Sequence, residues 1–234
     1  MLPWLTETPT DQLHQLRTTS LAKLARDEVL ASILRGQLAP GDRINEPDVA
    51  SRLQISRVPV REALRELESS GVVVSRKHSG VFVRRLEPKE VQDLYQMRAL
   101  LDGYAGRVAC RLPRPQVNAL VKQLTASAKR MEQAMLQEQS QAYYAENLQF
   151  HWALVEAAGN QELSDTYRGI VQKLHISRLK NLSGKVGMKT SIAEHRAIVK
   201  ALREGDSDLT ENLMARHVDD AFVRLQQLQP ETTP

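Results

Sequence analysis

Four polar side chains in the second half of the chain have types and spacings that suit a metal ion. Asn147 and His151 are four residues apart, so on one helix their side chains point the same way. His195 lies about ten residues before Gly205, and His217 lies about twelve after it. Two helices that fold back at this glycine bring both imidazoles to a similar height, as a metal site in the core of a helical bundle requires.

Spacing alone leaves a second interpretation of these residues open. Histidines on helices often fill a core or lie at the surface without binding anything, and His175 fits that role. From position and type alone, a metal site and a set of unrelated histidines therefore both remain possible.

A metal held by histidines would also suit a hydrolytic enzyme, which needs a general base beside the metal-bound water. The sequence has no His-Glu-x-x-His motif, and neither Glu146 nor Glu156 has an evident claim to that role. It also lacks a P-loop, a glycine-rich dinucleotide fingerprint and a nucleophile elbow. These absences favour a binding protein over an enzyme.

The stretch that must position these side chains is predicted to be entirely helical. Helix-breaking residues fall at Pro113 with Pro115, at Gly159-Asn160, at Ser183-Gly184 with Gly187, and at Gly205. They separate six predicted helices, Pro88–Leu112, Pro115–Leu136, Ser140–Ala158, Gln161–Leu182, Lys189–Glu204 and Asp206–Leu228. Six helices with short links indicate an antiparallel bundle.

Ahead of this bundle, the chain has the pattern of a helix-turn-helix. Leu21–Gly36 and Glu46–Leu53 are predicted helices, and a tight link at Gln54-Ile55 leads to a third helix that begins at Arg57. Ser56 is placed to cap this helix. Its apolar stripe is Val60, Ala63, Leu64 and Leu67, and another face carries Arg57, Arg61 and Arg65. Three guanidinium groups along one side suit a helix that enters the major groove of DNA.

A predicted β-hairpin follows this helix. The β-prone runs Val72–Val74 and Val81–Val83 are joined by Ser75–Gly80, which carries two cations and a turn glycine. Residues 21–85 hold 12 Lys and Arg against 8 Asp and Glu, an excess equal to the net charge of +4 of the whole chain. Basic surface there suits phosphate contacts. The alternative is a basic helix with a solvated face and an unrelated hairpin.

The remaining sequence features limit the cellular location and the domain organisation that we expect. No apolar run approaches the ~20 residues that span a bilayer, and the first residues lack the pattern of a signal peptide. The single cysteine, Cys110, excludes an internal disulfide framework. We therefore expect a cytoplasmic protein with an N-terminal arm (residues 1–20), a winged helix-turn-helix domain (21–85) and an all-helical domain (86–230).

Several of these motifs resemble those of GntR-family transcription regulators. The resemblance covers about residues 21–85 and is carried by Leu38–Glu46, Leu53–Leu67 and Gly80–Val83. It implies a winged helix-turn-helix that binds double-stranded DNA. The positions that it implies for DNA contact are Ser56, Arg57, Arg61, Ser79 and Gly80, with Arg43 and Arg65 carried over beside them.

The helical part is similar to the effector domain of the fatty-acid-regulator branch of that family. This similarity covers about residues 87–228 and is carried by Asn147–Asn160, Glu194–Leu202 and Met214–His217. It implies a divalent metal ion (Zn, Ni or Mn). The ligands that it implies are Asn147, His151, His195 and His217, and it places Arg98 facing the effector pocket. The alternative to effector binding for Arg98 is a surface salt bridge with Asp102, one helical turn further along.

One departure from the family pattern bears on the ligand. Asn147 stands where many relatives have Asp, and an amide is a weaker, neutral ligand. Three imidazoles and one amide would leave the charge of a divalent ion uncompensated, which favours a small organic acid or another oxyanion as effector.

The sequence therefore predicts a mainly α protein, with an N-terminal winged helix-turn-helix followed by an all-α antiparallel bundle. We expect a ligand-responsive regulator that binds a pseudo-palindromic operator as a homodimer. Family habit favours a repressor over an activator. The rival hypothesis is a DNA-binding protein whose helical domain serves only to dimerise.

Overall fold

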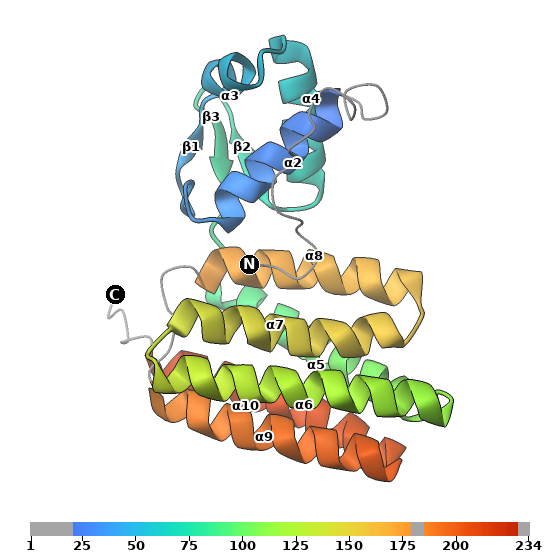
Figure 1. Ribbon diagram of the computed structural model, residues 1–234. Coiled ribbons are helices and arrows are strands. Elements are labelled where there is room, and N and C mark those ends of the chain that lie inside the picture. Colours follow the sequence, from blue (N-terminus) through green and yellow to red (C-terminus); the bar gives the residue numbers. More distant parts are fainter. Residues whose placement is uncertain (1–20, 179–184, 229–234) are drawn as a thin grey trace. The chain divides into compact units, whose positions relative to one another are not determined.

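The computed structural model describes residues 21–178 and 185–228, and Figure 1 labels their helices and strands. They form two compact units. Residues 21–87 belong to the first unit, and residues 88–171 with 185–228 belong to the second. The arm predicted for residues 1–20 lies outside the described residues. Among the described helices, none is long and apolar enough to cross a membrane.

The first unit is a winged helix-turn-helix. Its helices are α2 (Leu21–Leu34), α3 (Glu46–Leu53) and α4 (Arg57–Ser69), and its strands are β1 (Arg43–Ile44), β2 (Val73–Arg76) and β3 (Gly80–Val83). The three strands form one antiparallel sheet in the order β1-β3-β2, with Arg43 opposite Phe82. The sequence predicted only the β2–β3 hairpin, because a strand of two residues shows no periodicity.

Helix α4 is held in place by its predicted apolar stripe. Val60, Ala63, Leu64 and Leu67 are all buried, and α4 packs against α2, α3 and β2. Burial of each Val or Leu side chain contributes roughly 1.5–3 kcal/mol. Because the stripe occupies one side of α4, its arginine-bearing face is left to solvent.

The turn between α3 and α4 depends on one residue in the left-handed conformation. Gln54 ends α3 with φ 55°, and the next residue, Ile55, donates its N–H to the carbonyl of Ala50. Ser56 stands at the N-cap position of α4 but forms no side-chain cap hydrogen bond. The sequence therefore placed this residue correctly, but the cap hydrogen bond expected from it is absent.

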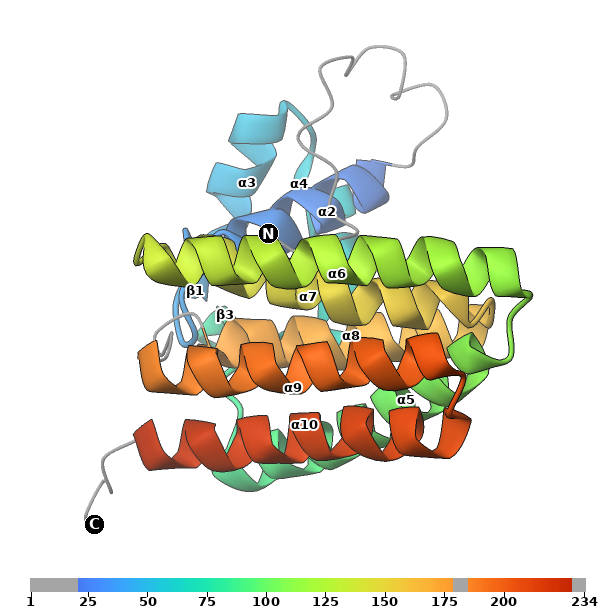
Figure 2. The same cartoon turned by 60° about the horizontal axis from the view of Figure 1, so that its bottom comes forward.

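The second unit is an all-helical bundle. Its helices are α5 (Pro88–Cys110), α6 (Arg114–Leu136), α7 (Ser140–Ala157), α8 (Gln161–Arg178), α9 (Lys185–Glu204) and α10 (Ser207–Leu228), and α8 belongs to it up to residue 171. Five of them form a closed ring, in which α5 packs on α10, α10 on α9, α9 on α6, α6 on α7, and α7 on α5 (Figure 2). Side chains that point inward from any of the five therefore meet in one core.

Helix α9 begins earlier than the sequence predicted. The sequence predicts a break at Gly187, but α9 starts at Lys185 and runs through this glycine. A single glycine inside a helix costs only about 1 kcal/mol, and a side chain at this position would lie 3.6 Å from Cδ of Arg224 on α10. The end predicted for the preceding helix, at Leu182, lies outside the described residues.

Two glycines let α5 and α10 approach closely. A Cβ at Gly106 would lie 3.0 Å from Cγ of Met214 and 3.1 Å from Cγ2 of Thr210, and a Cβ at Gly103 would lie 3.2 Å from the carbonyl oxygen of Glu211. This close packing holds the middle of α5 against the core, where its Asp102 has no exposed surface.

Candidate metal centre and DNA-binding surface

Three histidines from three helices of the ring converge in the core of the second unit. His151 comes from α7, His195 from α9 and His217 from α10, and all three are buried. One ring nitrogen from each lies within 4.8 Å of the others, and the ring centroids are 4.3 to 5.5 Å apart. The α9–α10 turn at Gly205, with φ +79°, folds the two helices back as expected. This cluster could hold a metal ion.

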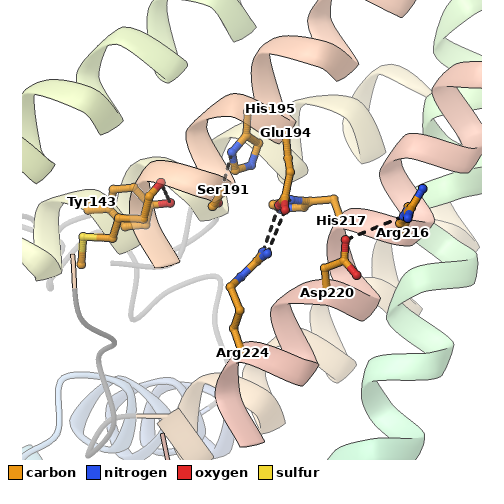
Figure 3. Close-up of polar contacts among 9 residues, drawn as sticks. Tyr143, Ser191, Glu194, His195, Arg216, His217, Asp220 and Arg224 are labelled. Carbon is orange, nitrogen blue, oxygen red and sulfur yellow. Dashed lines mark hydrogen bonds and ion pairs between the residues drawn. The ribbon is translucent and has the colours of Figure 1, made fainter. Parts of the chain in front are cut away.

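Each imidazole is held from outside the cluster through its Nδ1 atom. Nδ1 of His151 lies 2.8 Å from Oδ1 of Asp102. Nδ1 of His217 lies 2.6 Å from Oε2 of Glu194 (Figure 3). A carboxylate at Nδ1 fixes the proton there, so the lone pair of Nε2 is the one that remains for a ligand. His195 has a weaker contact, with Nδ1 3.4 Å from Oγ of Ser191.

The inward-facing atoms fit a metal ion. Nε2 of His151 and Nε2 of His195 are both fully buried and have no hydrogen-bond partner. A buried polar atom without a partner is costly, and a metal ion would satisfy both lone pairs at once. The donor set of neutral imidazoles is typical of Zn and Ni sites.

Burial keeps the imidazoles of His151 and His195 neutral. It lowers the pKa of His151 to about 4, against the opposing effect of the Asp102 carboxylate. It also lowers the pKa of His195 well below its ordinary value, and the neighbouring His217 and His151 act in the same direction. Both rings are therefore in the form that binds metal near pH 7.

Asp102 is a shared partner in this core. Its Oδ2 accepts a hydrogen bond of 3.1 Å from Nε of Arg98, and the hydroxyl of Tyr167 lies 3.3 Å from both carboxylate oxygens. Burial raises the pKa of this carboxyl, but His151 and Arg98 outweigh burial and hold the pKa below its ordinary value. The carboxylate is therefore ionised and balanced by the guanidinium of Arg98.

Glu194 has an equivalent place beside His217. Arg224 donates from both terminal nitrogens to its two carboxylate oxygens, at 2.8 and 2.9 Å (Figure 3). Burial raises the pKa of Glu194, but the hydrogen bonds from His217 and Arg224 outweigh it and lower the pKa to about 2. Each carboxylate at the cluster is thus paired with one arginine.

The structure places the other two predicted residues in the same region. Asn147 is buried one turn before His151 on α7, and its coordination of a metal stays a prediction. Arg98 does pair with Asp102, but the pair is not on the surface, because the two side chains are only 4% and 0% exposed. The sequence could not predict that this pair is buried, because the i, i+4 spacing of Arg98 and Asp102 also suits an exposed helix face.

The predicted DNA-contacting residues lie together on the surface of the first unit. Ser56, Arg57, Arg61 and Arg65 are exposed at the start and along one side of α4. Nε of Arg61 donates to Oε2 of Glu46 at 2.8 Å. This contact comes from the first residue of α3 and holds the guanidinium against the helix-turn-helix.

The wing brings together the remaining predicted contacts. Ser79 and Gly80 lie at the turn between β2 and β3, and Gly80 has φ +104°. The guanidinium of Arg43 lies along this glycine, because a Cβ built there would be 3.1 Å from Nε of Arg43. Glycine is thus required both by the backbone conformation and by the nearby arginine. Contact of these residues with DNA stays a prediction.

Sequence reasoning missed the residues that hold the histidines. Glu194 directly precedes His195, and Ser191 lies one helical turn before it. Their closeness to His195 in the sequence is the signal that could have identified both residues. Arg224 and Tyr167 gave no signal, because only the helix packing brings them to the cluster. For Asp102, the sequence predicts only a contact with Arg98.

The fold and these two regions define a class of DNA-binding protein, in which a winged helix-turn-helix is joined to an all-helical second domain. Two family models match the chain: "Bacterial regulatory proteins, gntR family" at residues 21–83, and "FCD domain" at residues 93–220. The chain belongs to the GntR family of bacterial regulators and has an FCD domain as its C-terminal part. It is therefore a transcription regulator and not an enzyme.

Named relatives agree with this assignment. The chain is 30% identical to a probable D-xylose utilization operon transcriptional repressor of Paenarthrobacter nicotinovorans, over 87% of this chain and 88% of that protein. It is 30% identical to an Nta operon transcriptional regulator of Aminobacter aminovorans, over 80% and 85%. A solved structure of a GntR regulator from Rhodococcus sp. RHA1 has the same fold, with a TM-score of 0.74 at 19% identity, covering 91% of this chain and 100% of that one.

Proposed function

We propose that the protein regulates transcription, most simply as a repressor, in response to a small anionic metabolite. The metabolite, an organic acid or another oxyanion, would bind at a metal centre in the helical unit and change the affinity of the winged unit for its operator. The observation that carries this proposal is the cluster of three buried imidazoles, two of which have an Nε2 atom without a partner.

The charges around the cluster favour an anion as the ligand. Asp102 forms an ion pair with Arg98, and Glu194 forms one with Arg224. The negative charge of each carboxylate is therefore already compensated and would not neutralise a metal ion. The donor atoms themselves would be neutral, with Asn147 as the fourth. An oxyanion that entered an open position would gain both coordination and neutralisation of the metal charge.

The donor set also narrows the identity of the metal. Imidazole nitrogen suits Zn and Ni, whereas Mn prefers carboxylate, carbonyl and water oxygens. Zn and Ni therefore fit the buried histidines better than Mn does.

Arg98 is our candidate for the second contact with the effector. It is buried in the same core, one helical turn from Asp102, which in turn contacts His151. Arg98 uses Nε for its bond to Asp102, and a planar guanidinium suits recognition of an oxyanion.

We also propose that the protein acts as a homodimer on a pseudo-palindromic operator. In support, α5 carries an apolar stripe that no other described element covers. Met97, Leu100 and Tyr104 are 46%, 66% and 46% exposed and recur at i, i+3 and i+7. A two-fold pairing through such a stripe would present two α4 helices to DNA. Sedimentation of wild type and Leu100→Glu tests this, with a dimer expected only for the wild type.

One experiment tests the proposed function as a whole. Purified protein is analysed for bound metal, and the operator is selected from a random duplex library. The complex is then titrated with a panel of carboxylates and phosphonates before and after chelation. We expect at least one of these compounds to change DNA affinity in the metal-loaded protein, and this effect to disappear on chelation and in His195→Ala.

Two results would count against the proposal. If chelated protein responds to the same compound at the same concentration, the metal has no part in sensing. If none of the compounds changes DNA affinity while sedimentation still shows a dimer, the helical unit serves for dimerisation, which is the rival hypothesis.

A further inference from the structure

The contacts around Glu194 carry a second, sharper inference about the same cluster. The carboxylate of Glu194 on α9 lies between two side chains of α10, His217 and Arg224, which are seven residues apart and so lie two turns apart on one face (Figure 3). All three side chains are less than a quarter exposed. One carboxylate group therefore serves both a candidate metal ligand and an arginine.

The contacts of Glu194 with His217 and with Arg224 have opposite effects on the strength of His217 as a metal ligand. A carboxylate that accepts the Nδ1–H of an imidazole fixes the tautomer and increases the electron density on Nε2, which strengthens the imidazole as a ligand. A bidentate guanidinium draws on the same oxygens and weakens that effect. The same combination recurs at His151, where Asp102 is shared with Arg98. An accidental contact would not be expected at both histidines.

We propose that Glu194 is a positioning residue for His217 and that Arg224 moderates it, so that the pair sets the metal affinity of the cluster. Glu194 raises the affinity by holding the ring and its tautomer, and Arg224 lowers it by taking up part of the carboxylate charge. The inference rests on the proposed function in one respect, since it requires the cluster to bind a metal ion.

The proposal predicts changes of opposite sign from the two halves of one ion pair. Glu194→Gln keeps the shape but removes the charge, and we expect Zn²⁺ and Ni²⁺ to bind roughly 10- to 100-fold more weakly. Arg224→Gln leaves the carboxylate to His217 alone, and we expect the same metals to bind at least about threefold more tightly. Arg224→Lys, which retains the positive charge, should return the affinity toward that of wild type.

The chain offers a matched control on the same helix. Arg216 directly precedes His217 but points away from the cluster, with its side chain 81% exposed and its Nε 3.9 Å from Oδ2 of Asp220 (Figure 3). Arg216→Gln removes the same formal charge as Arg224→Gln, close to the same histidine. Because an exposed charge is screened by solvent, we expect this variant to bind metal as wild type does.

The measurement is competition for Zn²⁺ and Ni²⁺ between a chromophoric chelator and each full-length variant, with urea unfolding of the metal-free proteins as a check on folding. A second readout needs no metal. Long-range ¹H–¹⁵N spectra of the metal-free protein report the His217 tautomer, which we expect to be Nδ1–H in wild type and in Arg224→Gln. Loss of that signature in Glu194→Ala would agree with the positioning role.

The outcomes separate this inference from the proposed function. If metal binds to wild type but both substitutions weaken it by similar factors, the pair is only structural and the inference is wrong, while the metal centre stands. If wild type shows the other tautomer, the positioning role fails whatever the metal does. If wild type binds neither metal, the metal centre and this inference fail together.

Discussion

Asp102 and His151 are joined by a 2.8 Å contact between Oδ1 and Nδ1, although they are 49 positions apart in the chain and neither has exposed side-chain surface. The contact links α5 to α7 across the core of the helical ring. Because Asp102 also accepts from Arg98, one ionised carboxylate connects the predicted effector contact to a predicted metal ligand. The core of the fold therefore holds a buried charge that contacts Arg98, His151 and Tyr167.

The first prediction concerns this buried charge. Asp102→Asn removes the counter-charge of Arg98, and we expect it to lower the free energy of unfolding by roughly 3–5 kcal/mol, because a buried guanidinium is left uncompensated. The double variant Asp102→Asn/Arg98→Met should recover part of this loss. Urea unfolding of the metal-free proteins measures both.

A matched control for this prediction lies on the same helix. Asp93 is exposed on α5 and pairs with Lys89, so Asp93→Asn should change the free energy of unfolding by less than about 0.5 kcal/mol. Equal losses for the single and the double variant at Asp102 would show that Arg98 does not depend on this carboxylate.

The second prediction concerns sequence readout by α4. Arg57→Ala and Arg61→Ala should each cost roughly 1–3 kcal/mol of operator affinity and reduce discrimination against a scrambled duplex. Both arginines are exposed on α4, and Arg61 donates a hydrogen bond to Glu46. Gel-shift titrations against both duplexes measure the effect. Arg216→Ala, on the helical unit, is the control, and full discrimination by both α4 variants would refute the recognition-helix assignment.

A third prediction concerns the wing. Gly80→Ala places a Cβ 3.1 Å from Nε of Arg43 on a backbone with φ +104°, so it should displace that guanidinium. Because phosphate contacts are independent of sequence, operator and scrambled duplex should lose affinity alike, with a salt slope reduced by about 1.

Gly159 supplies the control for the wing variant. It also has positive φ, +65°, but a Cβ there would meet nothing within 4 Å. Gly159→Ala therefore carries the backbone strain, roughly 1–2 kcal/mol, without displacing any arginine. We expect it to lower stability but leave DNA binding unchanged. If Gly80→Ala also leaves the salt slope unchanged, Arg43 makes no phosphate contact through this wing.

Periodicity in the sequence reveals helices and their buried faces. The stripe of Val60, Ala63, Leu64 and Leu67 predicted α4 because each residue's place on a helix follows from its number alone. The turn at Gly205 likewise predicted the pairing of His195 with His217. Local rules failed at β1, which is too short for a pattern, and at Gly187, because a single glycine costs only about 1 kcal/mol and does not end α9.

The carboxylates of the candidate centre could not be predicted for a different reason. Asp102 and Glu194 contact histidines on other helices, so their roles depend on how far each helix is shifted along and turned about its axis. Hydrophobic spacing specifies which face of a helix is buried, but not its register against its neighbours. Arg224, which balances Glu194, is hidden from sequence reasoning in the same way, whereas the pairing of Arg98 with Asp102 follows from their i, i+4 spacing and only its burial does not.

The last prediction concerns the pH dependence of the metal-free protein. Burial lowers the pKa of His151 to about 4, whereas the same residue in the unfolded chain takes up its proton near ~6.5. Between these values the unfolded state binds more protons, so the free energy of unfolding should rise with pH, and this contribution is complete above about 6.5. His195, whose pKa is also lowered by burial, should act in the same direction.

Between about pH 5 and 6.5, the pH dependence of the free energy of unfolding reports these histidines and not the carboxyl groups, which take up protons at lower pH. The pKa of Glu194 is lowered to about 2, so its contribution is lost only as pH falls below the ordinary glutamate range near ~4.3. Urea unfolding in the presence of a chelator, at half-unit steps across this window, measures the slope. His151→Gln should reduce the slope, because it removes one of the groups that must stay neutral. A stability that is flat from pH 5 to 6.5 in wild type would mean that the buried imidazoles take up protons as readily in the folded protein as in the unfolded chain.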